Sequence, residues 1–404
     1  MVADLRPRRA HRRPGGRGLK GAIPGNAVSL LENGHDYFPA LEASLDAAER
    51  EVYLQTYIFA ADATGRRIAD ALARAASRGV TVRVMVDGFG GREFVRSLMD
   101  ELVAAGVEVL IYRRELRALS LRRHRLRRLH AKLVVIDGRE AYVGGINILD
   151  DYDPKGPPFP RYDYAVRVEG PVLGRIVHSA HRLWWLVSWA GLRSRKGLPR
   201  LLTPAHTAPA GDIEAAFLVR ANLRHRHDIE DAYLEAINSA QSDILIANAY
   251  FFPGRRFRAA LVDAAERGVR ITLLLQGVAD HPIQQYATRA LYPYLLEKGI
   301  RLFEYHRSQL HAKVAVVDCC WATVGSSNID VFSLMLAREA NLVVEDERFA
   351  GTLRASVERA LEAGARELHH ETWQRLPRFK RALTWLAYQF VRWAIGIAGY
   401  GEKH

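Results

Sequence analysis

From residue 27 onward, short apolar runs rich in β-branched residues alternate with segments in which apolar residues recur every three or four positions. The short runs are typical of buried strands, and the longer segments are typical of amphipathic helices. Their alternation predicts an α/β fold with helices packed on a sheet. In the first half, we expect helices at 37–50, 65–78 and 93–105 and strands at 51–59, 80–86 and 107–112.

The same order returns in the second half of the chain. Helices are predicted at 229–240 and 259–267, and strands at 243–251 and 269–275. The Arg-Gly-Val turn that ends at Val80 is repeated in the turn that ends at Val269. This internal repeat indicates two similar α/β lobes.

The residue composition of two segments indicates where the lobes begin and end. Residues 1–25 are rich in Arg, Pro and Gly, so we expect a disordered basic tail. Residues 199–212 are rich in Pro, Gly and Thr with little charge, and we assign them as the linker. The lobes then cover 26–198 and 213–370, and residues 371–404 form a C-terminal segment.

One short motif occurs once in each lobe: a His, a Lys two residues later, an apolar run and an Asp. In both copies an Asn that ends a Gly-containing turn lies ten positions after the Asp. Two copies with the same trailing turn are difficult to obtain by chance. The shared positions are His130, Lys132, Asp137 and Asn147 in the first lobe, and His311, Lys313, Asp318 and Asn328 in the second.

The spacing of the motif suits phosphate chemistry. Side chains alternate along a strand, so the His and the Lys of each copy point to the same side. An ammonium group can hold phosphate oxygens while the imidazole acts at phosphorus. Asp137 and Asp318 fall on the opposite side or in the turn, and we interpret them as structural anchors. Glycines such as Gly145 would let the backbone approach a ligand, and the candidate phosphate-binding residues are Asn147, Asn328 and Ser326.

These paired motifs resemble the phospholipase D superfamily. The resemblance implies two sandwich-like α/β lobes related by a pseudo-twofold axis, with one active site at their interface. It implies that one His attacks phosphorus to form a phosphohistidine, while the other protonates the leaving alcohol and then activates the incoming nucleophile, without metal or cofactor. By analogy His130 is the nucleophile, although the near-symmetric repeat allows the reverse. The candidate catalytic residues are His130, Lys132, Asp137, His311, Lys313 and Asp318.

The resemblance also implies an acidic residue after each Gly-x-x-Asn turn. This residue hydrogen-bonds a catalytic His, fixes its tautomer and stabilises the imidazolium. Asp163 and Glu339 match these two positions. The alternative for each is a surface carboxylate.

Longer segments resemble bacterial cardiolipin synthases of the short type without N-terminal transmembrane helices. The similarity covers about residues 29–361 and includes the stretches at 30–34, 248–254 and 321–328. It implies transfer of a phosphatidyl group from one phosphatidylglycerol, or another phospholipid, to the hydroxyl of a second phosphatidylglycerol, with release of glycerol. The second substrate stays open between phosphatidylglycerol, phosphatidylethanolamine and other alcohols.

The net charge of +13 indicates an anionic partner. The two cysteines are adjacent and form no disulfide framework, which fits a reducing cytoplasm. The basic start of the chain shows no signal peptide. We therefore expect a peripheral protein on the cytoplasmic face of the bacterial cell membrane, with anionic phospholipids (phosphatidylglycerol and cardiolipin) as partners.

Three segments outside the repeat bear on membrane contact. The run 113–128 holds eight arginines interleaved with leucines, which suits an interface bearing phosphates. The tryptophans of 183–189 suit either the core or membrane anchors. Residues 379–398 are mostly apolar but contain Gln389 and Arg392, so we expect a helix in the bilayer interface or one docked on the protein.

Two other functions remain as alternatives. One is a hydrolytic phosphodiesterase of the phospholipase D type acting on phospholipid or nucleic acid, because the net charge also suits DNA. The other is a membrane-binding protein with an inactive site. The Arg/Leu run and the apolar C-terminal segment favour a membrane, so no nucleic-acid partner is expected. The intact motifs in both lobes argue against an inactive site.

Overall fold

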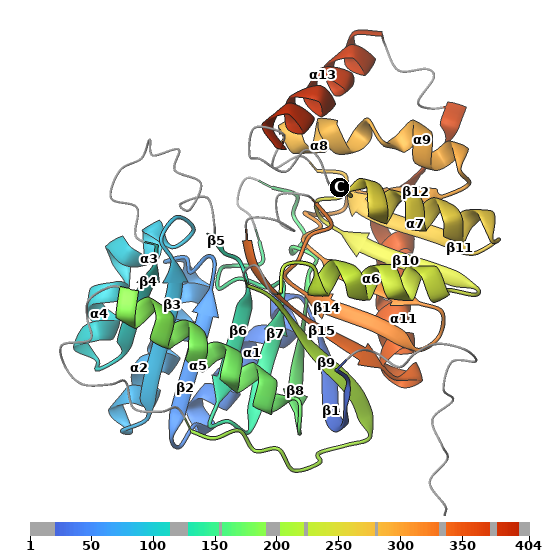
Figure 1. Ribbon diagram of the computed structural model, residues 1–404. Helices are drawn as coiled ribbons and strands as arrows, with labels where there is room; N and C mark the ends of the chain where they lie inside the picture. Colours follow the sequence, from blue (N-terminus) through green and yellow to red (C-terminus); the bar gives the residue numbers. More distant parts are fainter. Residues whose placement is uncertain are drawn as a thin grey trace, which may run out of the picture.

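The computed structural model describes residues 21–113, 128–152, 156–190, 203–221, 225–278, 282–330, 337–371 and 378–395. Its strands form one continuous sheet that runs through both lobes (Figure 1). Strands β1 (Ile23–Glu32) and β9 (Ile213–Arg220) pair antiparallel at the junction of the two lobes.

The strand order is the same on both sides of this junction. Outward from β1 come β8 (Tyr164–Glu169), β7 (Glu140–Gly144), β6 (Lys132–Ile136), β2 (Glu51–Thr56), β3 (Thr81–Asp87) and β4 (Glu108–Tyr112). Outward from β9 come β15 (Ala337–Glu345), β14 (Trp321–Gly325), β13 (Lys313–Val317), β10 (Asp243–Asn248), β11 (Arg270–Gln276) and β12 (Arg301–Tyr305), with β16 (Ala365–Leu368) at the edge. The two orders correspond strand for strand, which confirms the predicted pair of related α/β lobes.

Helices cover both faces of the sheet (Figure 1). One core continues through both lobes beneath α5 and α11, and each lobe has a second core on its other face. The continuous core fixes the lobes relative to one another. The helices of the first lobe are α1 (Asn33–Ala47), α2 (Ala63–Ser77), α3 (Arg92–Ser97), α4 (Met99–Ala104) and α5 (Leu173–Ala190). Those of the second are α6 (Asp228–Ser239), α7 (Arg255–Glu266), α8 (Pro282–Arg289), α9 (Tyr292–Glu297) and α11 (Glu347–Gly364), followed by α13 (Arg378–Ile395).

Several predicted boundaries need correction. The strand predicted at 243–251 ends at Asn248. The helices predicted at 37–50 and 259–267 span Asn33–Ala47 and Arg255–Glu266. The tail predicted for 1–25 is too long, because β1 begins at Ile23 and is held between β8 and β9. The helix predicted at 93–105 is two helices that meet at Leu98. The strand predicted at 51–59 ends at Thr56. Residues 114–127 of the arginine-rich run, residues 1–20 and residues 191–202 lie outside the described residues.

Asp137 and Asp318 anchor the motif strands from the end opposite to the histidines. Both have left-handed backbone conformations, with φ of 52° and 53°. The carboxylate of Asp137 accepts the backbone N–H groups of Glu49, Arg50 and Glu51, where β2 begins. Asp318 does the same at the start of β10. The two aspartates therefore stabilise the lobes and lie a whole strand away from the motif histidines.

The tryptophans of 183–189 divide between the core and the surface. Trp184 is buried and lies edge-on to Tyr53 beneath the sheet. Trp185 and Trp189 are exposed and stack on one another at the end of α5.

Helix α13 docks on the second lobe and also presents an apolar surface. It lies against α8 (Figure 1), with Val391 buried and the ring of Tyr388 5.6 Å from that of Phe252. Among the described residues, no helix is long and apolar enough to span a bilayer. Among the side chains of α13 whose burial is described, the exposed large apolar ones are Trp385, Leu386, Phe390 and Trp393.

Candidate active site

Each motif histidine is fixed to the opposite lobe through its backbone. In the first lobe, β5 (Arg128–Leu129) pairs in parallel with β15 of the second lobe. The N–H of His130, which follows β5, donates to the carbonyl of Arg338 at 2.9 Å. Reciprocally, the N–H of His311 donates to the carbonyl of Tyr162 at 2.8 Å.

The side chain of each motif histidine also contacts the opposite lobe. Nδ1 of His130 lies 3.0 and 3.1 Å from the carboxylate oxygens of Glu339. Nδ1 of His311 lies 2.5 Å from Oδ2 of Asp163. Both carboxylates are buried. Each acidic residue that the sequence singles out therefore binds the histidine of the other lobe.

This contact defines which ring nitrogen can react. A carboxylate accepts a hydrogen bond, so Nδ1 carries the proton in each pair. The neutral ring then presents the lone pair of Nε2. Two such rings, supplied by two lobes, have the chemistry needed for a nucleophile and a general acid or base.

The two motif lysines lie buried beside the histidines. Each ammonium group donates to the backbone carbonyl of the histidine in its own motif, and Nζ of Lys313 lies 3.9 Å from Oδ2 of Asp163. Burial lowers the pKa of Lys132 to about 7, opposed by Glu339 and reinforced by Lys313 of the other lobe. The charges of the two motifs therefore act on a common site.

Burial also keeps both imidazoles neutral in the free protein. It lowers the pKa of His130, against the attraction of Glu339, and Lys132 lowers it further. Burial and the charge of Lys313 lower the pKa of His311 to about 4. An anion bound between the lysines would offset their charge and raise the proton affinity of both rings.

The Gly-x-x-Asn turns support the carboxylates in different ways. A Cβ on Gly145 would lie 2.3 Å from Oδ1 of Asp163, so glycine leaves room for that carboxylate. At the equivalent position, Ser326 donates its hydroxyl to Glu339 at 2.6 Å and accepts the N–H of Ala340 at 3.0 Å. The Ser326 hydroxyl thus positions Glu339, and the phosphate-binding role expected for Ser326 stays a prediction. The sequence predicts that a ligand approaches Gly145 closely, and in the structure the carboxylate of Asp163 does so.

Asn147 and Asn328 are both buried. The amide oxygen of Asn147 accepts the N–H of Ile58 at 3.1 Å, which leaves the NH₂ group as its donor. Asn328 ends the second turn, directly before Ile329, whose N–H donates to the side chain of Asn248. Phosphate binding by the two asparagines stays a prediction.

The structure adds two positioning residues that the sequence analysis missed, Asp87 and Gln276. Both are buried and end the equivalent strands β3 and β11. Asp87 accepts the N–H of Leu129 at 2.8 Å, and Gln276 accepts the N–H of Leu310 at 3.0 Å. Each therefore fixes the residue before a motif histidine. The only signal in the sequence is a polar residue before Gly at the end of each apolar run.

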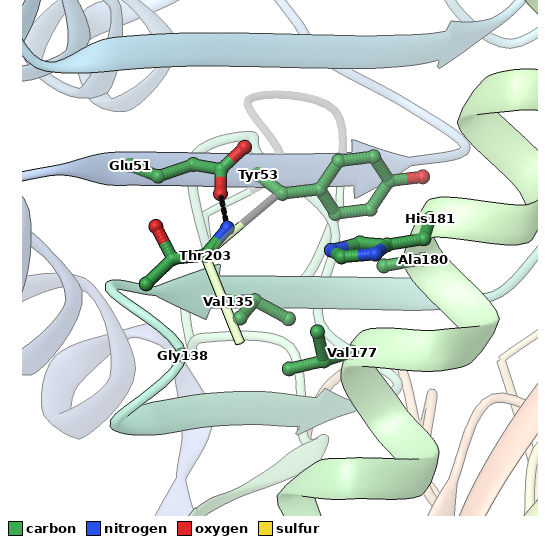
Figure 2. Close-up of a pocket in the computed structure, with 8 residues that line it drawn as sticks. All are labelled: Glu51, Tyr53, Val135, Gly138, Val177, Ala180, His181 and Thr203. Atoms are coloured by element: carbon green, nitrogen blue, oxygen red, sulfur yellow. Dashed lines mark hydrogen bonds between the residues drawn. The ribbon is translucent and has the colours of Figure 1, made fainter. Parts of the chain in front are cut away.

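The close-up in Figure 2 shows a small cavity beneath α5 that is separate from this site. Glu51, at the start of β2, lies at its wall and accepts the N–H of Thr203 at 2.5 Å. The motif histidines lie beyond the opposite end of β2, since β6 runs antiparallel to it. The described residues contain no group of three or more His, Cys, Asp or Glu side chains that could hold a metal ion.

Comparison with known families agrees with this geometry. The family described as "Cardiolipin synthase, PLD-like domain" matches residues 41–151 and 233–361, one segment in each lobe. The chain therefore belongs to the cardiolipin synthase family with a phospholipase D-like domain. The family and the enzyme class expected from the sequence, a phosphatidyltransferase of the phospholipase D superfamily, are confirmed.

Individual relatives extend this result over most of the chain. The chain is 38% identical over 394 residues to Cardiolipin synthase B of Shigella flexneri and to that of Escherichia coli K12, covering 94% of this chain and 91% of each relative. It is 30% identical to the major cardiolipin synthase ClsA of Bacillus subtilis, over 87% of this chain and 72% of that protein. In fold, it is similar to phosphatidylserine synthase of Haemophilus influenzae, with a TM-score of 0.66, 14% identity and coverage of 93% and 95% of the two chains.

Replacing either carboxylate by its amide should impair catalysis without unfolding the protein. In Glu339→Gln and Asp163→Asn, the amide no longer fixes the Nδ1–H tautomer or stabilises the imidazolium. We expect kcat to fall by about 10²- to 10⁴-fold, as for other carboxylate–histidine pairs. Steady-state kinetics measure the effect, with the melting temperature as the folding control. A variant that kept a third of wild-type kcat would contradict the role assigned to the carboxylate.

The pH dependence of kcat/KM should reflect the free site. Above about pH 7, Lys132 loses its proton and with it the charge that holds phosphate, so kcat/KM should fall. In Lys132→Arg, residual activity should lack the alkaline fall, because a guanidinium stays protonated. A wild-type profile that is flat up to pH 9 would contradict this assignment.

Proposed function

We propose that this chain is a cardiolipin synthase that transfers a phosphatidyl group from one phosphatidylglycerol to the hydroxyl of another and releases glycerol. The observation that carries the proposal is the pair of histidines, each held at Nδ1 by a carboxylate from the other lobe. The two buried lysines suit a phosphodiester substrate. The similarity to proteins named cardiolipin synthase B supports the choice of lipid.

The first step forms a phosphohistidine. Nε2 of His130 attacks phosphorus, and the bond from phosphorus to the glycerol oxygen breaks. His311 gives its Nε2 proton to the departing glycerol oxygen, which leaves as glycerol. This assignment of the two rings rests on analogy with the superfamily. The proton on His311 is acquired with the substrate, because the anionic phosphodiester raises the proton affinity of the ring.

The second step transfers the phosphatidyl group from His130 to the acceptor lipid. Neutral His311 takes the proton from a hydroxyl of the second phosphatidylglycerol. The resulting oxygen attacks phosphorus, and the bond from phosphorus to His130 breaks. The products are cardiolipin and the free imidazole, so two phosphatidylglycerol molecules give one cardiolipin and one glycerol.

Charge on the reacting phosphate needs stabilisation in both steps. Lys132 and Lys313, protonated beside the bound anionic phosphodiester, supply positive charge in a buried site, where its effect is larger than in water. The amide groups of Asn147 and Asn328 are the proposed donors to the same oxygens. Asp163 and Glu339 stabilise each imidazolium as it forms.

We further propose that the protein binds the cytoplasmic face of the bacterial cell membrane as a peripheral protein through α13. Its exposed tryptophans and Phe390 suit the bilayer interface. The helix also lies near the active site, because Tyr388 contacts Phe252, whose N–H donates to Ile329 directly after Asn328. A lipid bound at α13 is therefore near the second Gly-x-x-Asn turn.

Product analysis with labelled phosphatidylglycerol tests the reaction. Wild type should form cardiolipin and glycerol, while His130→Ala and His311→Ala should fold and form no cardiolipin. A trapped phosphatidyl adduct should be absent from His130→Ala and should accumulate slowly in His311→Ala, which retains the nucleophile. Wild-type activity in either variant would contradict a shared site. Phosphatidic acid as the main product would favour the hydrolytic alternative, and cleavage of single-stranded DNA would favour a nuclease.

Vesicle binding tests the role of α13. The triple variant Trp385→Ser/Phe390→Ser/Trp393→Ser should bind phosphatidylglycerol vesicles at least about tenfold more weakly, since each aromatic side chain contributes 1 kcal/mol or more when buried. Its activity on detergent-dispersed lipid should stay near wild type. The control is Trp185→Ser/Trp189→Ser, which removes the exposed stacked pair on α5. Equal loss of vesicle binding in both variants, or equal loss in both assays, would contradict the proposal.

A further inference from the structure

Joining two phosphatidylglycerol molecules requires the site to hold two phosphodiesters. One reacts at the histidines, and the other belongs to the acceptor lipid and stays intact. In the product a three-carbon glycerol bridge links the two phosphates. A second anion site should therefore lie about one glycerol bridge away from the reacting phosphorus.

Phe89, in the loop after β3, has an exposed aromatic ring, and the guanidinium groups of two arginines lie near this ring. The guanidinium carbon of Arg92 lies 4.2 Å from the ring centroid of Phe89, and that of Arg128 lies 4.9 Å from it. The two guanidinium carbons are thus at most 9.1 Å apart, the sum of these distances. The electron-rich face of the ring attracts cations and holds the planar groups in place. An anion bound by both guanidinium groups would reduce the repulsion of their like charges, which the carboxylate of Asp87 near Arg128 already offsets in part.

This loop is tied rigidly to the first catalytic histidine. One carboxylate, that of Asp87, accepts the N–H of Phe89 at 2.8 Å and the N–H of Leu129 at 2.8 Å. Gly90 packs against the backbone of Tyr57, where a Cβ would lie 2.4 Å from the carbonyl oxygen. The ring of Tyr57 in turn lies 5.1 Å from that of His130.

Arg128 lies on the same side of the chain as His130. Leu129 between them is fully buried, while Arg128 and His130 are each partly exposed. Two residues of extended chain separate the origins of these side chains by about 7 Å. This separation is similar to the length of a glycerol bridge with its two ester oxygens.

At the described positions of the second lobe that correspond to this arrangement, other residues stand. The position equivalent to Arg128 is Gln309, whose side-chain oxygen accepts a hydrogen bond from Arg161. The positions equivalent to Phe89 and Tyr57 are Val278 and Ala249. The second-lobe side also has a cation–ring contact, since Arg307 lies 4.4 Å from the ring centroid of Phe159, but the pair of arginines around Phe89 stands on the first-lobe side of the pseudo-twofold axis.

We propose that Arg92 and Arg128, positioned by Phe89, bind the intact phosphodiester of the acceptor phospholipid. The inference rests on the proposed cardiolipin synthase activity and names the acceptor as a lipid with its own phosphodiester. An acceptor without phosphate, such as glycerol, has no group for these arginines.

Two reactions of the same donor separate this role from a structural one. Cardiolipin formation needs the acceptor phosphodiester, whereas exchange of labelled glycerol into phosphatidylglycerol does not. In mixed micelles at subsaturating phosphatidylglycerol, Arg92→Gln/Arg128→Gln should lower cardiolipin formation at least about tenfold, since the variant loses charge-assisted hydrogen bonds to the acceptor phosphodiester. Glycerol exchange should change less than about twofold.

The matched control is Arg301→Gln/Arg348→Gln. It removes the same charge, and Arg301 also lies over an aromatic ring, that of Phe303, at 5.0 Å. Arg301 begins β12 at the end of the sheet remote from the histidines, and Arg348 pairs with Asp212 before β9. Both reactions should proceed at wild-type rates in this control. If the glutamine pair does not fold, Arg92→Lys/Arg128→Lys serves instead, with a smaller loss confined to cardiolipin formation.

Equal loss of both reactions in the arginine variant would overturn the proposal, because it would indicate donor binding or a structural role. Unchanged cardiolipin formation would also overturn it. A loss of binding to phosphatidylglycerol vesicles would assign the arginines to general membrane attraction. A wild-type protein that forms no cardiolipin would instead contradict the proposed function itself.

Discussion

The site depends on a crossed pair of hydrogen bonds between histidine and carboxylate. Glu339 of the second lobe holds His130 of the first, and Asp163 of the first lobe holds His311 of the second. A buried carboxylate is stable only with its partners in place. Burial alone would raise the pKa of Asp163, yet Lys313 and His311 hold that pKa below its usual value. Both pairs therefore need the lobes at one fixed separation, which the continuous sheet and the shared core maintain.

Much of this architecture could be predicted from local patterns. Alternating apolar periods define the strands and helices, and the repeated motif places a His and a Lys at the start of β6 and of β13. The anchoring role of Asp137 also follows from its position in the motif, because an odd step along a strand points away from the histidine. These features depend on residues close in sequence, and so a single sequence contains them.

The rest depends on contacts between distant segments. The sequence marks Asp163 and Glu339 but does not show that each crosses to the other lobe. Asp87 and Gln276 carry no motif, because a single hydrogen bond to a backbone N–H imposes no spacing pattern. Ser326 stands in a turn typical of ligand binding, but its hydroxyl is engaged by Glu339. The boundary predicted for the N-terminal tail is wrong for a similar reason, because pairing of Ile23 and Asn26 with β9 orders residues of low intrinsic propensity.

The two halves are similar in backbone and different at the site. Gly145 corresponds to Ser326, Asp87 to Gln276, and Tyr57 to Ala249. A lone half could complete such a site only by pairing with a second copy of itself, and every substitution would then appear twice. In a single polypeptide each substitution appears once, on one side of the axis. Covalent linkage of the two halves thus allows a division of labour between two substrates that a symmetric homodimer could not encode.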